Sequence, residues 1–163
     1  AMAGIAGPVI WIAGAAQRAR LNPQGLAALS DPGRVIFVSP RRAPDILWSM
    51  EEALRAGVVP LVVAELAAPP ALTPVRRLTL AAETSGQRPT ALLLTPGDGG
   101  AAGVESRWHI APAHRGETRA WQLERRRARM EPPRSWGVRA DGGRLVVTPE
   151  PSGGAERPGR IRS

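Results

Sequence analysis

Short runs of apolar residues recur along the first hundred positions of the chain. They cover residues 9–12, 35–38, 61–63 and 91–94, and each run is continuous rather than alternating. Continuous runs of β-branched and aliphatic residues are typical of strands that are buried on both faces of a parallel sheet. The pattern therefore predicts four parallel strands in this part of the chain.

Helical signals lie between these runs. Asn22 and the proline after it predict a short helix that ends near Leu29. Pro44 predicts the start of a longer helix, in which apolar residues return every three or four positions until Gly57 stops it. A third helix is expected from 73 to 86. The β-α-β-α-β-α-β order predicts right-handed crossovers, with helices on both faces of the sheet.

The period of the apolar residues changes to two after Val104. Alternating stretches around 107–110, 121–124 and 136–139 are followed by a turn sequence at 141–143 and a last apolar run at 145–147. Such alternation predicts antiparallel strands with one wetter face, which we expect to extend the edge of the parallel sheet. We therefore predict one α/β domain over residues 8–148. Residues 149–163 are rich in proline, glycine, serine and arginine and are expected to be a disordered tail.

Composition excludes several kinds of chemistry. The chain has no cysteine, so disulfides, thiolate metal sites and cysteine nucleophiles cannot occur. All 22 basic residues are arginines, and the absence of lysine excludes a Schiff-base lysine and the lysine of a phosphate-binding loop. The longest apolar stretch is too short to span a bilayer, and we expect a cytoplasmic protein.

No cluster of residues predicts a catalytic centre. His109 and His114 flank a proline, their five-residue spacing on an extended segment does not place them on one face, and no carboxylate cluster supports a metal, so a metal site is not expected. The glycine-rich segment 97–100 follows a strand but lacks the helix of a dinucleotide-binding motif. We therefore expect a protein that is not an enzyme and that binds no cofactor and no metal.

Two groups of residues are candidates for binding a partner. The outer face of the second helix is expected to carry Glu51 and Glu52, with Trp48 nearby. Trp48 is either half-buried core or the anchor of a contact with a partner or with a second copy, because tryptophan is frequent at interface hot spots.

The second group lies in the basic part of the chain, where residues 103–163 hold thirteen arginines against seven acidic residues. Alternation along a strand would place Arg125, Arg127 and Arg129 on one face. Such a row can hold phosphates of DNA or carboxylates of a protein, or it can simply keep an edge strand charged and solvated.

The order of elements resembles the core of RecA-type recombinases after the phosphate-binding loop. The segment 58–65 occupies the place of the Walker B strand, with Ala64 at the position of the magnesium-linked aspartate. The catalytic glutamate position falls within 14–16, and the nucleotide-sensing position falls near Pro96. Arg127 and Arg129 match two spaced lysines that reach a neighbouring subunit in recombinase filaments. The resemblance implies a RecA-like sheet without the ATPase.

The chain more closely resembles the ImuA family of RecA-like mutasome accessory proteins. The resemblance is carried by Leu47–Gly57, 72–83, Val104–Trp108 and Trp121–Arg129, and it extends over about residues 8–147. Many members of that family have an upstream segment, with the Walker A region, that is not found here.

The resemblance implies a role in SOS-induced translesion synthesis and DNA-damage-induced mutagenesis. It further implies binding to ImuB, an inactive Y-family polymerase, with RecA, an error-prone DnaE-type polymerase or DNA as further contacts. Two alternatives stay open: a SulA-like cell-division inhibitor that binds FtsZ, and a protein that binds DNA directly.

Overall fold

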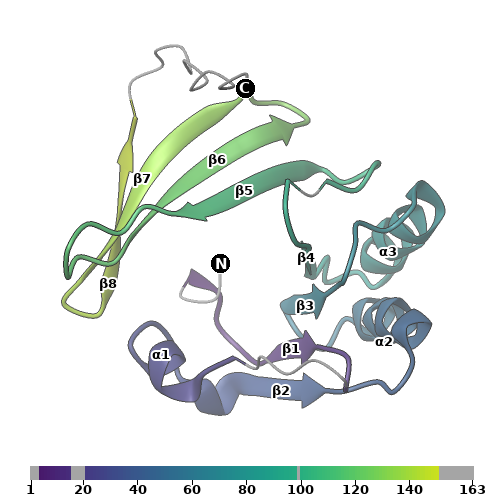
Figure 1. Cartoon of the computed structure of the whole chain (residues 1–163). Coiled ribbons are helices and arrows are strands. Elements are labelled where there is room, and N and C mark those ends of the chain that lie inside the picture. The colour runs from purple at the N-terminus through teal and green to yellow at the C-terminus, as the bar shows by residue number, and fades with distance from the viewer. Residues whose placement is uncertain (1–3, 16–20, 99, 151–163) are drawn as a thin grey trace, which may run out of the picture. The chain divides into compact units, whose positions relative to one another are not determined.

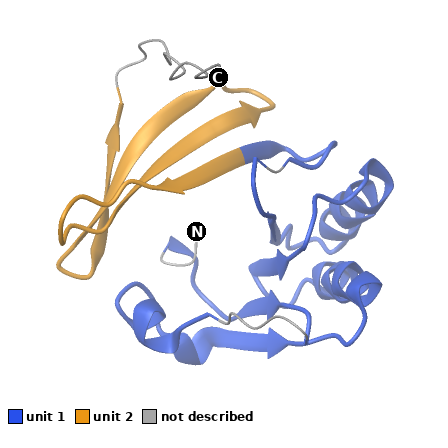
Figure 2. Cartoon of the chain, viewed as in Figure 1, with its two compact units in different colours: residues 1–107 blue, residues 108–163 orange. Residues whose placement is uncertain are grey.

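The computed structural model of the chain describes residues 4–15, 21–98 and 100–150. It divides into two compact units, residues 1–107 and residues 108–163 (Figure 2). The first unit contains the parallel sheet and the helices, and the second contains an antiparallel sheet. The chain is thus of the mixed α/β class that the sequence predicts. The prediction of one domain over 8–148 stays a prediction.

The parallel unit has the strand order β2-β1-β3-β4 (Figure 1). Its elements are β1 (Val9–Ile12), α1 (Pro23–Ala27), the 3-10 turn η2 (Pro32–Arg34), β2 (Val35–Val38), α2 (Ala43–Ala56), β3 (Leu61–Glu65), α3 (Leu72–Thr84) and β4 (Thr90–Leu94). All three strand pairs are parallel. The four predicted strands are confirmed, and the first two have the predicted bounds.

Helix α2 shows how local sequence fixes an element. Pro44 lies in the first turn and Asp45 follows it, where the free N–H groups of the helix favour a negative charge. Gly57 ends the helix in the left-handed conformation, with a φ of 64°, and its N–H donates to the carbonyls of Ala53 and Leu54. The predicted start and stop signals are confirmed.

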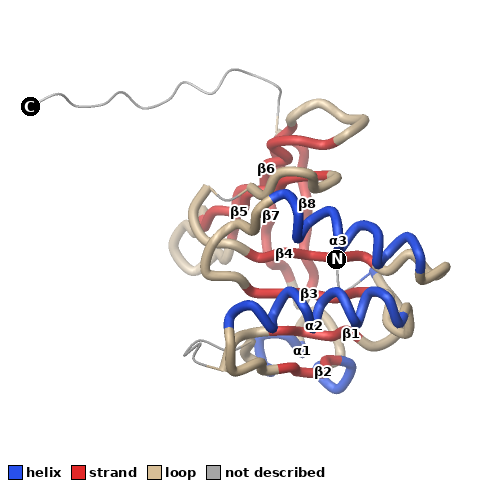
Figure 3. The backbone as a smooth tube through the Cα atoms, turned by 90° about the vertical axis from the view of Figure 1, so that its right-hand side faces the viewer, coloured by secondary structure: helices blue, strands red, loops and turns tan. Residues whose placement is uncertain are grey.

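The core of the parallel unit lies between the sheet and two helices. Helices α2 and α3 lie on one face, whereas the five-residue α1 lies on the other (Figures 1 and 3). The main cluster joins Ile12, Val62 and Ala64 of the strands to Met50, Leu54 and Leu78 of the helices. A second cluster on the opposite face consists of Val9, Leu61 and Val63. The strands are therefore packed on both faces, as their continuous apolar runs predict.

The second unit is an antiparallel sheet of order β5-β6-β7-β8. Its strands are β5 (Ser106–Pro112), which begins just before the unit does, β6 (Ala120–Ala128), β7 (Arg134–Asp141) and β8 (Arg144–Pro149). Our expectation that these strands extend the edge of the parallel sheet is wrong, because within the described residues they form a sheet of their own. Alternation indicates that neighbouring segments pair as antiparallel strands. It does not indicate whether those strands join another sheet.

Two further predictions concern the C-terminal tail and membrane-spanning segments. Pro149 still belongs to β8, and residues 151–163 of the predicted tail lie outside the described residues. No helix among the described residues is long and apolar enough to cross a membrane.

Candidate interaction surfaces

Trp48 stands on the exposed side of α2. Its exposed fraction is 60%, although its neighbours along the helix, Ile46 and Met50, are buried in the core. Of the two interpretations of the sequence, half-buried core and exposed anchor, the burial favours the second. Tryptophan is enriched among the residues that dominate the binding energy of protein interfaces.

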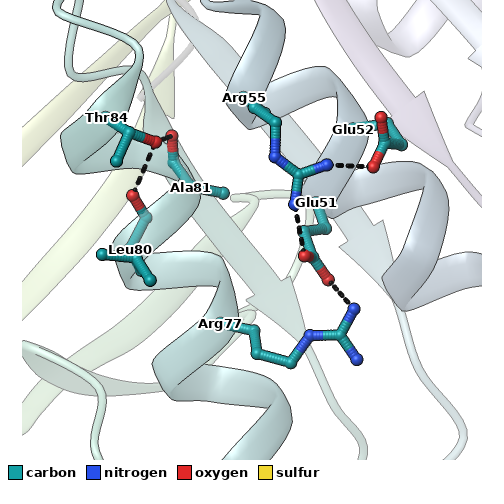
Figure 4. Close-up of polar contacts among 7 residues, drawn as sticks. All are labelled: Glu51, Glu52, Arg55, Arg77, Leu80, Ala81 and Thr84. Atoms are coloured by element: carbon teal, nitrogen blue, oxygen red, sulfur yellow. Dashed lines mark hydrogen bonds and ion pairs between the residues drawn. The ribbon is translucent and has the colours of Figure 1, made fainter.

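Glu51 does not lie on the outer face of α2, as the sequence pattern suggested. It is only 7% exposed and accepts ion pairs from Arg55 of the same helix and Arg77 of α3, each at 2.6 Å (Figure 4). The carboxylate therefore connects α2 to α3. Helical periodicity missed this because it places residue 51 one step from the apolar stripe and carries no information on the neighbouring helix.

Arg55 connects this buried pair to the solvent. It also pairs with Glu52, whose side chain is 46% exposed. The two carboxylates, Glu52 first and Glu51 second, raise the pKa of Arg55 above its ordinary value. The guanidinium is therefore charged at every physiological pH, and the exposed side of α2 presents an acidic and a basic group close to each other.

The neighbouring helix adds a second apolar residue. Leu80 of α3 is 61% exposed. The Thr84 hydroxyl donates to the Leu80 carbonyl at 2.9 Å and to the Ala81 carbonyl at 3.1 Å (Figure 4), which holds this last turn of the helix. Together, Trp48, Glu52, Arg55 and Leu80 give the α2–α3 layer exposed apolar and charged groups, which we call the helix surface.

Arg125 is the centre of the second candidate surface, but it is not free. It is 8% exposed, and its Nε and Nη2 donate to the Pro132 carbonyl at 3.2 and 3.1 Å. Its guanidinium carbon lies 5.6 Å from the ring centre of Trp108 and 5.3 Å from that of Trp136. A further ion pair joins it to Glu131. Arg125 therefore holds β5, β6 and β7 together.

The other two arginines of the predicted row differ from Arg125. Arg127 and Arg129 are exposed, and Arg129 lies beyond the end of β6. The structure thus separates one buried arginine, which stabilises the sheet, from two exposed ones. Alternation predicts 125 and 127 on the same side of β6, but Arg125 is buried and Arg127 is exposed. Arg125 is buried because the tryptophans of the neighbouring strands contact it.

The arginine–tryptophan cluster was not predicted from the sequence. Trp108 and Trp136 have ring centres 5.4 Å apart, and Arg125 contacts both rings. The available signal was the alternation that puts each tryptophan on the apolar side of its strand. The pairing of β6 with β7 then sets Trp136 opposite Leu123, two residue pairs from Arg125.

The resemblance to RecA-type recombinases assigns an ATPase site to positions that carry other residues here. Ala64 is completely buried in β3, and the carboxylate of the next residue, Glu65, accepts a hydrogen bond from Trp11 Nε1 at 2.5 Å. Among the described residues, no three histidine or acidic side chains are grouped so that they could hold a metal. Ala16, the last residue of the catalytic-glutamate segment, and Gly99 of the glycine-rich turn lie outside the described residues.

Comparison with known structures found the crystal structure of SulA from Pseudomonas aeruginosa. The TM-score is 0.45 and the sequence identity is 22%, over 55% of this chain and 72% of that one. No protein-family profile matches the chain.

Comparison of sequences found Protein ImuA of two strains of Caulobacter vibrioides. In each case the sequences are 36% identical over 152 residues, and the match covers 82% of this chain. The chain spans about three fifths of the length of these relatives, 61%. At this identity and coverage, the resemblance noted from the sequence is confirmed, and the chain belongs to the ImuA family.

Proposed function

We propose that this protein is a non-catalytic adaptor of a bacterial translesion-synthesis complex, in which it supports DNA-damage-induced mutagenesis through contacts with other proteins. The family assignment supports the mutasome context. The observation that carries the adaptor role is Trp48, which a well-packed helix holds 60% exposed, on the same helix as the exposed Glu52–Arg55 ion pair. An ImuB-like inactive Y-family polymerase is the proposed partner, and RecA and an error-prone DnaE-type polymerase are further proposed members of the complex.

The composition of the helix surface supports this role. Trp48 and Leu80 supply the apolar area, and Glu52 and Arg55 supply a polar rim. Interfaces of this kind concentrate their binding energy in a few aromatic anchors that a rim shields from water. Glu51 contributes indirectly, because it fixes the position of Arg55 and the spacing of the two helices.

The test is binding of the purified chain to an immobilised ImuB-like polymerase. Trp48→Ala should weaken binding about 30-fold, which corresponds to roughly 2 kcal/mol for an aromatic hot spot. The thermal melt should change little, because most of the side chain is in water. Met130→Ala is the matched control, since Met130 is 87% exposed and lies in the other unit. Absence of binding by the unmodified chain contradicts the adaptor role. Equal binding by the Trp48→Ala and Met130→Ala variants contradicts the proposal that the helix surface binds the partner.

The exposed arginines favour a second candidate function, direct contact with single-stranded DNA. Arg127 and Arg129 are exposed in the most basic part of the chain, and their planar groups suit phosphate. If they bind DNA, the logarithm of the binding constant falls with the logarithm of salt concentration, and each lost phosphate contact flattens that slope by about one unit. An Arg127→Ala, Arg129→Ala double variant that keeps the same slope and affinity rules this function out.

A further inference from the structure

Among the residues that the structure describes, the outermost strand of the antiparallel sheet has no neighbour on one side. Strand β8 forms one edge of that sheet (Figure 1), and all of its residues are exposed. Its three central residues, Leu145, Val146 and Val147, are apolar and 46%, 39% and 52% exposed. Edge strands are usually protected by charges, bulges or prolines because their free backbone groups pair readily with other strands. Here the only charge, Arg144, and the only proline, Pro149, stand at the two ends.

Two hydrogen bonds show which backbone groups of β8 are free. The Glu150 N–H donates to the Ser135 carbonyl, and the Ala140 N–H donates to the carbonyl of Arg119, the residue just before β6 on the other side of β7. Antiparallel ladders alternate between bonded and non-bonded pairs, so both observations require even-numbered residues of β8 to bond to β7. The N–H and C=O groups of Leu145 and Val147 therefore point outward. Pro149 also falls on the outward side, where its missing N–H costs no bond within the sheet.

We propose that β8 pairs with β8 of a second copy of this chain, in antiparallel orientation, with a two-fold axis at Val146. In this register Leu145 of each copy lies opposite Val147 of the other. The N–H and C=O groups of these two residues then form four hydrogen bonds across the axis. The apolar side of β8 continues on the same face in both copies, because only residues of the same parity are opposite one another. The two sheets become one.

The charges at the ends of β8 fit the same register. Arg144 of one copy lies diagonally across from Glu150 of the other, on the same face of the joined sheet. Diagonal neighbours in an antiparallel pair are about 7–8 Å apart, which a long arginine side chain can bridge. Glu150 is already held in place by a hydrogen bond from the Gln122 side-chain amide at 3.2 Å. A closed, isologous pair of this kind is the commonest form of self-association.

The absence of cysteine from the chain allows a direct test with single-cysteine variants of this chain. Val146→Cys places one thiol on the two-fold axis, in a non-bonded pair with Cα atoms about 4.5 Å apart, within the range for a disulfide. Thr148→Cys is the matched control, because residue 148 lies on the same strand and face but opposite residue 144 of the partner. Mild oxidation should convert the Val146→Cys variant into a covalent dimer, whereas the Thr148→Cys variant should stay largely uncrosslinked.

Charge substitutions at the axis test the contact without oxidation. In sedimentation or light-scattering experiments the unmodified chain should dimerise with increasing concentration. Val146→Glu and Val146→Arg should each lose the dimer, since like charges then meet across the axis, and an equal mixture of the two should regain it. A chain that stays monomeric throughout overturns the proposal. So does a dimer that both charged variants retain, or equal crosslinking of the two cysteine variants.

Discussion

Replacing Arg125 with alanine removes the group that joins three strands of the antiparallel sheet. The variant loses a charged donor pair to the Pro132 carbonyl and two contacts with tryptophan rings. Hydrogen bonds to a charged group contribute about 1.5–3 kcal/mol, and each cation–π contact contributes about 0.5–1 kcal/mol. The pair with Glu131 adds little, because that carboxylate is 61% exposed. We expect a loss of about 3 kcal/mol in the free energy of unfolding.

The assay is thermal and urea denaturation followed by circular dichroism and by tryptophan fluorescence, to which Trp108 and Trp136 contribute two of the five tryptophans of the chain. A loss of about 3 kcal/mol lowers the melting temperature by about 10 °C for a chain of this size. The melting temperature of the Arg125→Lys variant should fall between those of the unmodified chain and the Arg125→Ala variant, since lysine keeps the charge but lacks the planar guanidinium. The control is Arg127→Ala, which removes an exposed arginine from the same strand. If the Arg125→Ala and Arg127→Ala variants melt within about 1 °C of each other, the bonds and ring contacts do not stabilise the sheet as argued.

Three further predictions concern the parallel unit. Gly57→Ala should cost about 1–2 kcal/mol in unfolding free energy, because the residue has a positive φ and a Cβ there would lie 2.9 Å from Ser85 Cβ. If the Gly57→Ala variant is as stable in urea as the unmodified chain, the turn after α2 adjusts to the added Cβ and the expected cost is wrong. Glu51→Ala should lower the unfolding free energy by about 1 kcal/mol, since it removes the ion pair with Arg77. An unchanged melting temperature contradicts a stabilising role for this ion pair. Magnesium–ATP should leave the melting temperature unchanged and show no turnover, because the resemblance to RecA-type recombinases implies that Ala64 stands at the position of the metal-linked acid. A clear thermal shift argues against this.

The elements of the fold were largely predictable from the sequence alone. Each parallel strand is a short β-branched or aliphatic run between helical segments, and the ends of α2 are set by Pro44 and Gly57. These signals are local. A buried strand needs apolar side chains on both faces, and a helix needs suitable caps, whatever lies elsewhere in the chain. The antiparallel strands were likewise visible as alternation, down to the turn at 141–143 that separates β7 from β8.

Only the tertiary structure decided which charged residues are exposed. Glu51 and Arg125 each sit in a row of charged residues in the sequence, yet both are buried. Their surroundings come from elements distant along the chain: α3 supplies Arg77, while β5 and β7 supply the two tryptophans. A local pattern fixes the direction of a side chain relative to its own helix or strand. It cannot say what meets that side chain there, because burial depends on contacts between segments that only packing brings together.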